Sequence, residues 1–164
     1  MGSMGERCEL DQNADIISGV DVFSSLSRER LKLLAFLSKR ISFREGDFIF
    51  RQGDSDDRAY IIVYGSVHIM REYDSYSIIV STVHKGDFFG GLALLSNISR
   101  LFSARATEAT EVLLIESESF RKLMLQFPEM AIRVMDSMVK RITQFEDKLL
   151  KTHVPKSVVD KPEL

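Results

Sequence analysis

Apolar residues in the middle of the chain come in short runs separated by glycine-led turns. Between about residues 41 and 115 these runs are rich in β-branched and aromatic residues, and glycines at 46, 53, 65 and 86 interrupt them. Such a texture predicts short strands joined by tight turns. The predicted strands are 48–50, 59–63, 67–70, 77–83, 104–107 and 111–115. At least six strands at this spacing favour a small barrel or sandwich of the β-roll kind.

Helical periods flank this β region on both sides. Leucines at 31, 34 and 37 follow a capping serine, Ser27, and predict a short amphipathic helix over 27–38. After Ser119 the pattern is helical again, stops near Pro128 and resumes as a longer helix over 129–151. The fold class expected is therefore mainly β with flanking helices: a jelly-roll-like β-roll barrel, an N-terminal helix and a long C-terminal helix.

The long helix carries an apolar seam with steps of four and three residues. Its members are Ala131, Met135, Met138, Ile142, Phe145 and Leu149. This spacing is typical of a two-stranded coiled coil and predicts a homodimer through the C-terminal helix. The alternative is a helix that covers only its own domain, because further apolar residues widen the seam.

A chain of 164 residues with 45% hydrophobic residues fits one compact domain, expected over residues 20–150. Residues 1–19 are expected to be disordered, and their first residues, Met1-Gly2-Ser3, are typical of an expression leftover before a native start at Met4. Residues 151–164 contain two prolines and little periodicity, which predicts a disordered tail or a linker.

The formal charge of −2 and pI near 5.9 give no basic field for nucleic acid or for an anionic membrane surface. Cys8 is the only cysteine, so neither a disulfide nor a cysteine metal site is expected within one chain. Together with the lack of a spanning run or signal peptide, this favours a cytoplasmic protein.

Candidate catalytic and metal-ligating groups are sparse. His68 and His84 are isolated, which favours surface or internally bonded residues over haem or metal ligands. Asp54, Asp56 and Asp57 form an acidic cluster in a turn, better suited to solvation than to metal binding. No serine has an adjacent base, and we expect a protein that is not an enzyme and needs no cofactor.

One segment interrupts the β pattern and is the best candidate for a ligand site. Gly90 and Gly91 open a short apolar run, and Arg100 follows at close range. Glycine lets a ligand approach the backbone, the first turn of a helix offers unpaired N–H groups, and a guanidinium holds phosphate oxygens with paired donors. The pattern predicts binding of a small phosphorylated ligand, against the alternative of an ordinary glycine turn with a surface arginine.

Two stretches resemble the cyclic nucleotide-binding domain family, which includes catabolite activator proteins and the regulatory subunits of cyclic-AMP-dependent protein kinase. Residues 46–67 are similar to the family's first hairpin signature, and residues 86–100 to its phosphate-binding cassette. The resemblance covers about residues 20–150. It implies a β-roll that binds a cyclic nucleotide through the cassette, with the phosphate on Arg100.

The cassette departs from the family pattern at two places. Ligand-binding members carry, after the Phe-Gly pair, an acidic residue that accepts hydrogen bonds from the ribose 2′-hydroxyl, and here that position is Gly91. Two small residues usually follow the arginine, and here they are Leu101 and Phe102. The loss of one charge-assisted acceptor is expected to cost about 1.5–3 kcal/mol. The anion half of the site is therefore intact and the sugar half is not.

The resemblance places the ligand-binding residues along the cassette and at one position of the long helix, where the base contact falls near Phe145. The predicted site residues are Phe89, Gly90, Gly91, Leu92, Ala93, Arg100, Leu101, Ser103 and Phe145. The predicted function is a non-catalytic sensor of cyclic AMP, cyclic GMP or a related phosphorylated ligand that signals through the C-terminal helix. Two alternatives stay open: a ligand-independent dimerisation or docking module of the same fold, and the sensor half of a transcription regulator.

Overall fold

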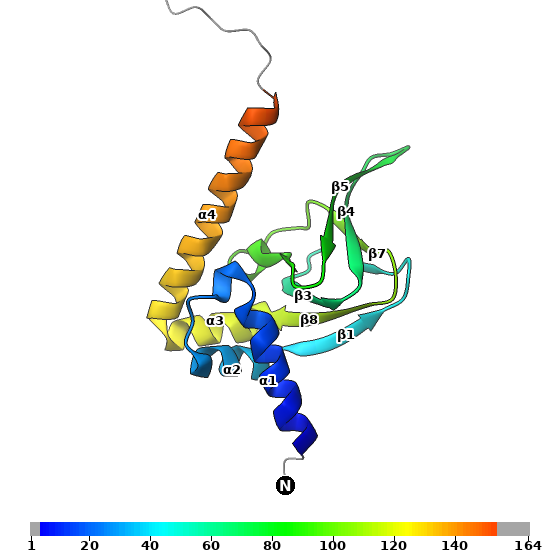
Figure 1. The fold of residues 1–164 in the computed structure, drawn as a ribbon. Coiled ribbons are helices and arrows are strands. Elements are labelled where there is room, and N and C mark those ends of the chain that lie inside the picture. The colour runs from blue at the N-terminus through cyan, green and yellow to red at the C-terminus, as the bar shows by residue number, and fades with distance from the viewer. Residues whose placement is uncertain (1–3, 154–164) are drawn as a thin grey trace, which may run out of the picture.

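The computed structural model describes the backbone of residues 4–153 and the side chains of residues 9–151 apart from Leu149. Two four-stranded antiparallel sheets form a β-roll (Figure 1), with strand orders β1-β8-β3-β6 and β2-β7-β4-β5. The strands are β1 (Lys39–Phe43), β2 (Phe48–Phe50), β3 (Arg58–Tyr64), β4 (Ser66–Glu72), β5 (Ser77–His84), β6 (Phe88–Phe89), β7 (Ser103–Ala106) and β8 (Thr110–Glu116). All six predicted strands are present, while β1 and β6 were not predicted.

The two central strands of the first sheet are buried on both faces. Successive side chains of a strand point to opposite faces, so β3 sends Tyr60 and Ile62 into the roll and Ala59 and Ile61 toward the helices. β8 alternates in the same way beside it. This double burial explains why these strands are continuous apolar runs in the sequence.

Three turns between the strands share one hydrogen bond. The carboxylates of Asp47, Asp54 and Asp87 each accept a backbone N–H from the residue three positions earlier, at 2.8 Å. Aspartate favours turns because its short side chain can bond to the nearby backbone in this way. The Gly-Asp pairs that marked the turns in the sequence therefore have a structural role.

Helices cover the outer face of the first sheet. They are α1 (Met4–Ser18), α2 (Arg28–Phe36), α3 (Ser117–Gln126) and α4 (Pro128–His153), with single turns of 3₁₀-helix at η1 (Asp21–Phe23) and η2 (Gly91–Leu94). The predicted cap is confirmed, because the Ser27 hydroxyl accepts the Arg30 N–H at 3.4 Å. Pro128 begins α4 at the position where a missing N–H costs least.

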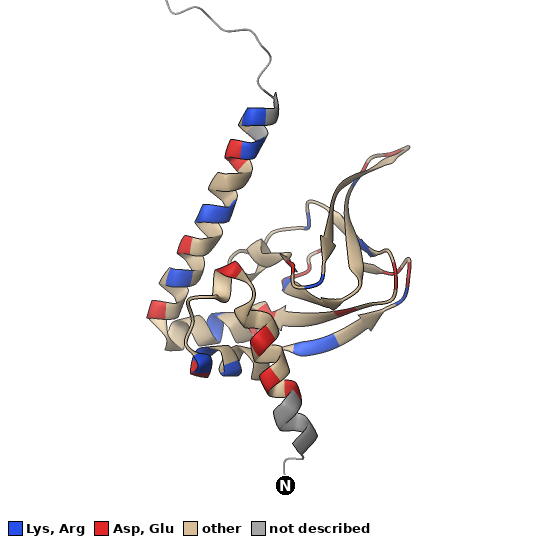
Figure 2. Cartoon of the chain, viewed as in Figure 1, with Lys and Arg blue, Asp and Glu red and all other residues tan. Residues whose placement is uncertain are grey.

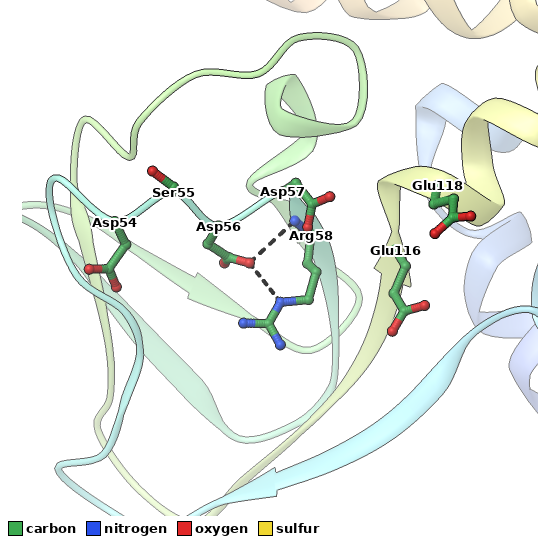
Figure 3. A pocket seen from close by; sticks show the side chains of 7 residues that line it. All are labelled: Asp54, Ser55, Asp56, Asp57, Arg58, Glu116 and Glu118. Carbon is green, nitrogen blue, oxygen red and sulfur yellow. Dashed lines mark hydrogen bonds and ion pairs between the residues drawn. The ribbon is translucent and has the colours of Figure 1, made fainter.

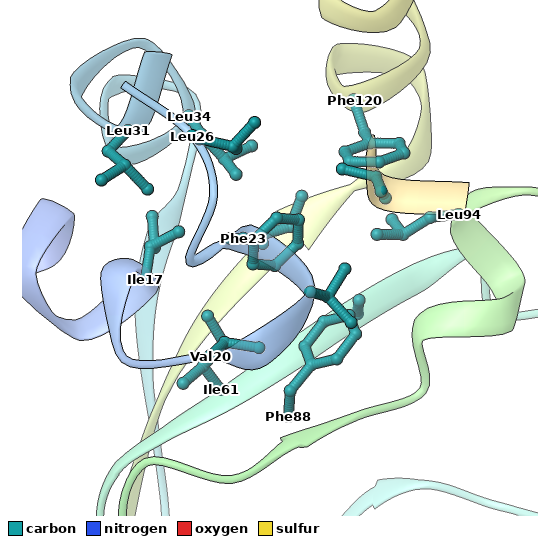
Figure 4. Packing of buried hydrophobic residues seen from close by; sticks show 14 of the residues in the cluster. Ile17, Val20, Phe23, Leu26, Leu31, Leu34, Ile61, Phe88, Leu94 and Phe120 are labelled. Atoms are coloured by element: carbon teal, nitrogen blue, oxygen red, sulfur yellow. The ribbon is translucent and has the colours of Figure 1, made fainter. Parts of the chain in front are cut away.

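A buried cluster joins these helices to the sheet (Figure 4). At its centre the Phe23 ring packs edge-to-face with the rings of Phe88 and Phe120. The ring centroids are 5.4 Å apart in the first pair and 6.4 Å apart in the second. Edge-to-face contacts of this kind add to the stabilisation from area burial alone. Phe88 belongs to the strand that leads into the predicted ligand site, so the site is anchored to the helical core.

The expected disorder of residues 1–19 is wrong for most of that segment. Residues Met4–Ser18 form α1, and Ala14 and Ile17 are fully buried in the helical cluster. The helix is tied to α2 by Arg28, whose guanidinium lies 2.6 Å from the Asp15 carboxylate. Its apolar positions are few and its polar residues many, so the burial comes from α2 and the sheet rather than from a strong local pattern.

The long helix α4 has two apolar faces with different surroundings. Met130, Val134 and Met138 are buried against the domain, whereas Met135 and Phe145 are exposed. Ile132, Val139 and Ile142 are also exposed. The predicted seam is therefore divided, since Met138 faces the protein's own core. Acidic and basic residues alternate along the helix (Figure 2), and Lys140 pairs with Asp136 at 2.8 Å.

The predicted tail 151–164 lies largely outside the described residues, as do the side chains of Cys8 and Leu149. Within residues 4–153, no helix is both long enough and apolar enough to cross a bilayer.

Candidate functional site

The predicted cassette begins on a sheet edge and turns sharply at Gly90. β6 pairs with β3 through Phe89 opposite Tyr60, and Gly90 then takes φ +76°, in the left-handed region. A Cβ at this position would also lie 2.8 Å from Nη1 of Arg100. Glycine is thus required at 90 both for the backbone conformation and for the approach of the guanidinium. The apolar run that follows forms only the single 3₁₀ turn η2, with little helix dipole of its own.

Arg100 is buried, with 7% of its surface exposed, and most of its donors are used inside the protein. Nη1 donates to the carbonyl of Gly90 at 3.1 Å, and Nη2 donates to the Asp56 carboxylate at 2.9 Å and to the Arg58 carbonyl. The guanidinium carbon lies 4.0 Å from the centroid of the Phe50 ring. The Nε–H alone is buried without an acceptor among the described residues.

Asp56 is the centre of this network, which sequence reasoning had treated as part of a solvated turn. Its carboxylate accepts hydrogen bonds from the Arg58 Nε at 2.6 Å and the Tyr60 hydroxyl at 2.8 Å, in addition to Arg100. Burial by itself raises the pKa of Asp56, but these three hydrogen bonds outweigh it and hold the pKa below its usual range. Asp56 is therefore a buried anion that fixes the arginine of the cassette.

Tyr60 links the same network to the interior of the roll. Its ring stacks on Phe89 with centroids 5.3 Å apart, next to Phe50. Burial, and then the hydrogen bond to Asp56, raises the pKa of Tyr60 above its usual value, so the hydroxyl stays a donor at neutral pH. The cassette thus rests on an aromatic stack whose polar ends converge on Asp56.

A pocket of about 330 Å³ opens against the cassette, within the usual size of small-molecule sites. Of the predicted site residues, it is lined by Phe89, Gly90, Gly91, Leu92, Ala93, Arg100 and Leu101. Ile69, Ser81 and Val83 from the β4–β5 hairpin line it as well, and Arg141 reaches it from α4. The structure therefore brings most of the predicted site together.

Ser103 does not line this pocket, contrary to expectation. It is fully buried in β7, where its hydroxyl donates to Glu72 at 2.5 Å and accepts the backbone N–H of Gln52 at 2.8 Å. The hydrogen bond from Ser103 is the main reason why the pKa of Glu72 lies below its usual value. The strand alternation after Arg100 turns this side chain away from the pocket and into the junction of β2 and β4.

Phe145 also lies outside the pocket, with 58% of its side chain exposed on the outer half of α4. The residue that α4 brings to the pocket is Arg141, one turn earlier. Its Nη2 donates to the Phe88 carbonyl at 3.3 Å, and its guanidinium lies 5.5 Å from the centroid of the Phe88 ring. Sequence reasoning missed Arg141 because it is one of several charged residues on an exposed helix.

Gly91 has an ordinary backbone conformation but little room for a side chain. A Cβ there would lie 2.5 Å from Cε1 of Phe88 and 3.6 Å from Cε of Met138. The Phe88 ring therefore occupies the space in which an acidic side chain at position 91 would begin. The missing carboxylate at position 91 is therefore accompanied by a Phe88 ring that fills the space that its side chain would need.

A second, acidic pocket of about 600 Å³ lies at the start of β3 (Figure 3), lined mostly by Asp54, Asp57, Glu116 and Glu118. Its charges are largely compensated locally: Arg58 pairs with Asp56, Lys39 pairs with Glu116 at 2.8 Å, and the Ser117 hydroxyl donates to Asp57 at 2.6 Å. Among the described side chains, no group of three or more histidine, cysteine or acidic residues is placed to hold a metal ion.

A β-roll with a glycine-led cassette and a buried arginine has the fold of the cyclic nucleotide-binding β-roll. A family model described as the cyclic nucleotide-binding domain matches residues 40–127, more than half of the chain. The chain therefore belongs to the cyclic nucleotide-binding domain family, as its sequence motifs predicted.

Similar proteins from several organisms support this assignment. A cAMP-dependent protein kinase regulatory subunit from Dictyostelium discoideum is 30% identical over 133 residues, which cover 79% of this chain and 39% of that protein. A cyclic nucleotide-binding-like protein from Brucella abortus is 37% identical with a TM-score of 0.64, covering 70% of this chain and 98% of that one. The catabolite activator protein from Thermus thermophilus is 26% identical with a TM-score of 0.69, covering 79% of this chain and 61% of that one.

The chain thus spans about two fifths of the length of the first curated relative.

Proposed function

We propose that the chain is a non-catalytic regulatory module that binds a cyclic nucleotide, such as cyclic AMP or cyclic GMP, in the pocket beside the cassette. The observation that carries this proposal is Arg100, which lines the pocket and whose buried Nε–H has no acceptor among the described residues. A buried donor without a partner costs about 1–3 kcal/mol, and a phosphate oxygen would satisfy it. Family membership supports the same ligand class.

The contacts between the cassette and α4 support signalling through that helix. Arg141 binds the Phe88 carbonyl, and the terminal methyl group of Met138 lies next to Gly91. A ligand that moves the backbone at 88–91 must therefore also change the packing of α4. We propose that ligand binding in the pocket shifts α4 and that this shift is the signal. We further propose that the exposed face of α4 forms a homodimer, and that the chain acts in the cytoplasm as part of a larger regulator.

A ligand-independent docking or dimerisation module remains the second candidate. It is favoured by the ion pair between Arg100 and Asp56, because the Asp56 carboxylate already neutralises the guanidinium that would otherwise bind a phosphate. The exposed Leu101 beside Arg100 and the missing carboxylate at Gly91 point the same way.

The two candidates are separated by calorimetric titration of the protein with cyclic AMP and cyclic GMP. If the sensor proposal holds, at least one nucleotide binds, and Arg100→Lys weakens it at least about ten-fold because lysine keeps the charge for Asp56 but lacks the Nε–H and the planar fork. Arg105→Lys is the matched control, since Arg105 lies on β7, the strand that follows Arg100 in the chain, and donates to the Gly46 carbonyl outside the pocket. A folded protein that binds neither nucleotide would be the docking module. Unchanged affinity in Arg100→Lys would place the site elsewhere.

A further inference from the structure

Two guanidinium groups approach the cassette from opposite sides of the sheet. Arg100 lies over Phe50 on the side of the roll interior, and Arg141 lies over Phe88 on the side of the helical cluster. Both line the pocket of about 330 Å³. Figure 1 shows α4 rising beside the cassette, which explains how a residue from the end of the chain reaches a site built by the β-roll.

The two arginines differ in how their charges are compensated. Asp56 neutralises Arg100 within the protein, at 2.9 Å. Arg141 has a carbonyl and an aromatic face as its partners, and no carboxylate among the described residues pairs with it. The pocket lining contains no aspartate or glutamate either. Arg141 therefore supplies the uncompensated positive charge of this pocket.

The wall next to Arg141 carries no side-chain carboxylate among the described residues. Gly91 has no side chain, and the Phe88 ring fills the space where one would begin. The Phe88 carbonyl is already bonded to the Arg141 guanidinium. A ligand hydroxyl at this wall would find a donor opposite it, whereas a ligand anion would find a solvent-exposed guanidinium whose protein partners are a neutral carbonyl and an aromatic face.

We propose that Arg141 determines ligand specificity and that the preferred ligand is a nucleotide with two separate anionic groups, its phosphate at Arg100 and a second acid on the sugar side at Arg141. This proposal rests on the proposed function, because it uses the same pocket and the same phosphate position. The second anion replaces the Phe88 carbonyl as the partner of Arg141, and its charge-assisted hydrogen bonds are stronger than the one they displace. In binding, the ligand also breaks the hydrogen bond between Arg141 of α4 and the cassette backbone.

The test compares two esters of cyclic AMP that differ in one terminal group. The 2′-O-succinyl ester ends in a carboxylate and the 2′-O-butyryl ester ends in a methyl group, so both place a chain of similar size at the same sugar oxygen. We expect the wild-type protein to bind the succinyl ester at least about ten-fold tighter than the butyryl ester, measured by calorimetry. In Arg141→Gln the preference should be lost, so that the two esters bind with equal affinity.

Lys140→Gln is the matched control, since it removes the same charge from the next residue of α4, where Lys140 pairs only with Asp136 among the described carboxylates. The preference for the succinyl ester should survive in this variant, and circular dichroism should show both variants to be folded. Equal binding of the two esters by the wild type, a preference that survives Arg141→Gln, or binding of cyclic AMP but of neither ester overturns this proposal alone. If no nucleotide binds, the proposed function fails and this proposal fails with it.

Discussion

The Asp56 carboxylate and the Arg100 guanidinium form a buried ion pair, with Oδ2 and Nη2 2.9 Å apart and both side chains less than a tenth exposed. The residue expected to meet a ligand phosphate is therefore already paired inside the protein. A phosphate that enters the pocket must either share Arg100 with Asp56 through the free Nε–H or displace the carboxylate. The ion pair holds the guanidinium in place for the first arrangement and opposes the second.

Asp56→Asn should destabilise the protein strongly, because the amide keeps the shape of the side chain but leaves a buried cation without its counter-ion. Breaking a buried pair in this way typically costs about 3–5 kcal/mol. The measurement is urea denaturation at neutral pH. Asp54→Asn is the control, since Asp54 accepts the exposed Arg51 N–H, a hydrogen bond that the amide oxygen of asparagine can also accept, so this change should cost no more than about 1 kcal/mol. Similar losses in the two variants would contradict the central role of Asp56.

The same ion pair should make stability sensitive to acid. The folded pKa of Asp56 is lowered by its hydrogen bonds from a value of 3.8 expected in the unfolded chain. Between the two pKa values the unfolded state binds more protons, so the contribution of Asp56 is complete above about pH 5 and is lost as the pH falls through the folded pKa.

This pH dependence can be tested by comparing the wild type with Asp56→Asn. The difference in their free energies of unfolding should shrink as the pH is lowered from about 5 to about 3, because only the wild type can take up the proton at this site. Denaturation curves at several pH values at constant ionic strength provide the measurement. A difference that stays constant over this range would show that Asp56 is not held ionised by the network.

The strands, the turns and most of the cassette were predictable because their signals are local. Short runs of β-branched and aromatic residues, cut by glycine-led turns, identify β2 to β5, β7 and β8 within a residue or two. Gly90 and Arg100 are close in sequence, so their spacing alone suggested an anion site. The family signatures depend on the same short-range patterns.

The parts that sequence reasoning missed depend on contacts between distant segments. Asp56 looks like its acidic neighbours in the chain, and only its pairing with Arg100, 44 residues away, shows it to be buried. The burial of Ile17 comes from α2 and the sheet, not from the weak pattern of α1. Arg141 reaches the cassette because of where α4 crosses the domain, which no spacing in the sequence specifies.

Adding a side chain at Gly91 should be costly because of Phe88. The Cβ of Gly91→Ala would lie 2.5 Å from the Phe88 ring, which is itself held by Phe23, and overpacking of this kind typically costs about 1–3 kcal/mol. Thermal and urea denaturation measure the loss. Gly19→Ala is the control, since its Cβ would meet nothing closer than 3.5 Å and should change stability by no more than about 1 kcal/mol.

Phe88→Leu should relieve this clash. In a double-mutant cycle, Gly91→Ala should cost less in the Phe88→Leu background than in the wild type, because the ring edge that opposes the new Cβ is gone. The same reasoning modifies the simple expectation that an acidic residue at 91 restores a ribose contact: Gly91→Glu should tighten cyclic AMP only when Phe88 is also reduced in size. Additive losses in the cycle would mean that the two positions do not compete for space.

The exposed apolar residues of α4, which include Ile142 and Phe145, should mediate self-association. Its buried residues, such as Val134, should instead stabilise the fold. Ile142 and Phe145 are exposed and face away from the domain core, so the double variant Ile142→Ser/Phe145→Ser should unfold at nearly the wild-type urea concentration but weaken a dimer in sedimentation experiments. Lys140→Ser/Gln144→Ser is the matched control, because it makes two exposed substitutions on the same helix outside the apolar stripe. Val134→Ala should do the opposite of the first variant, since Val134 is fully buried: it should lower stability by about 1–3 kcal/mol without a direct effect on association.

Sedimentation of the wild-type protein at roughly 50 μM tests whether the exposed residues of α4 pair with a second copy, because an interface with a Kd in the low micromolar range would be occupied at that concentration. If the wild type is a monomer there, α4 does not pair with a second copy and transmits the signal within one chain.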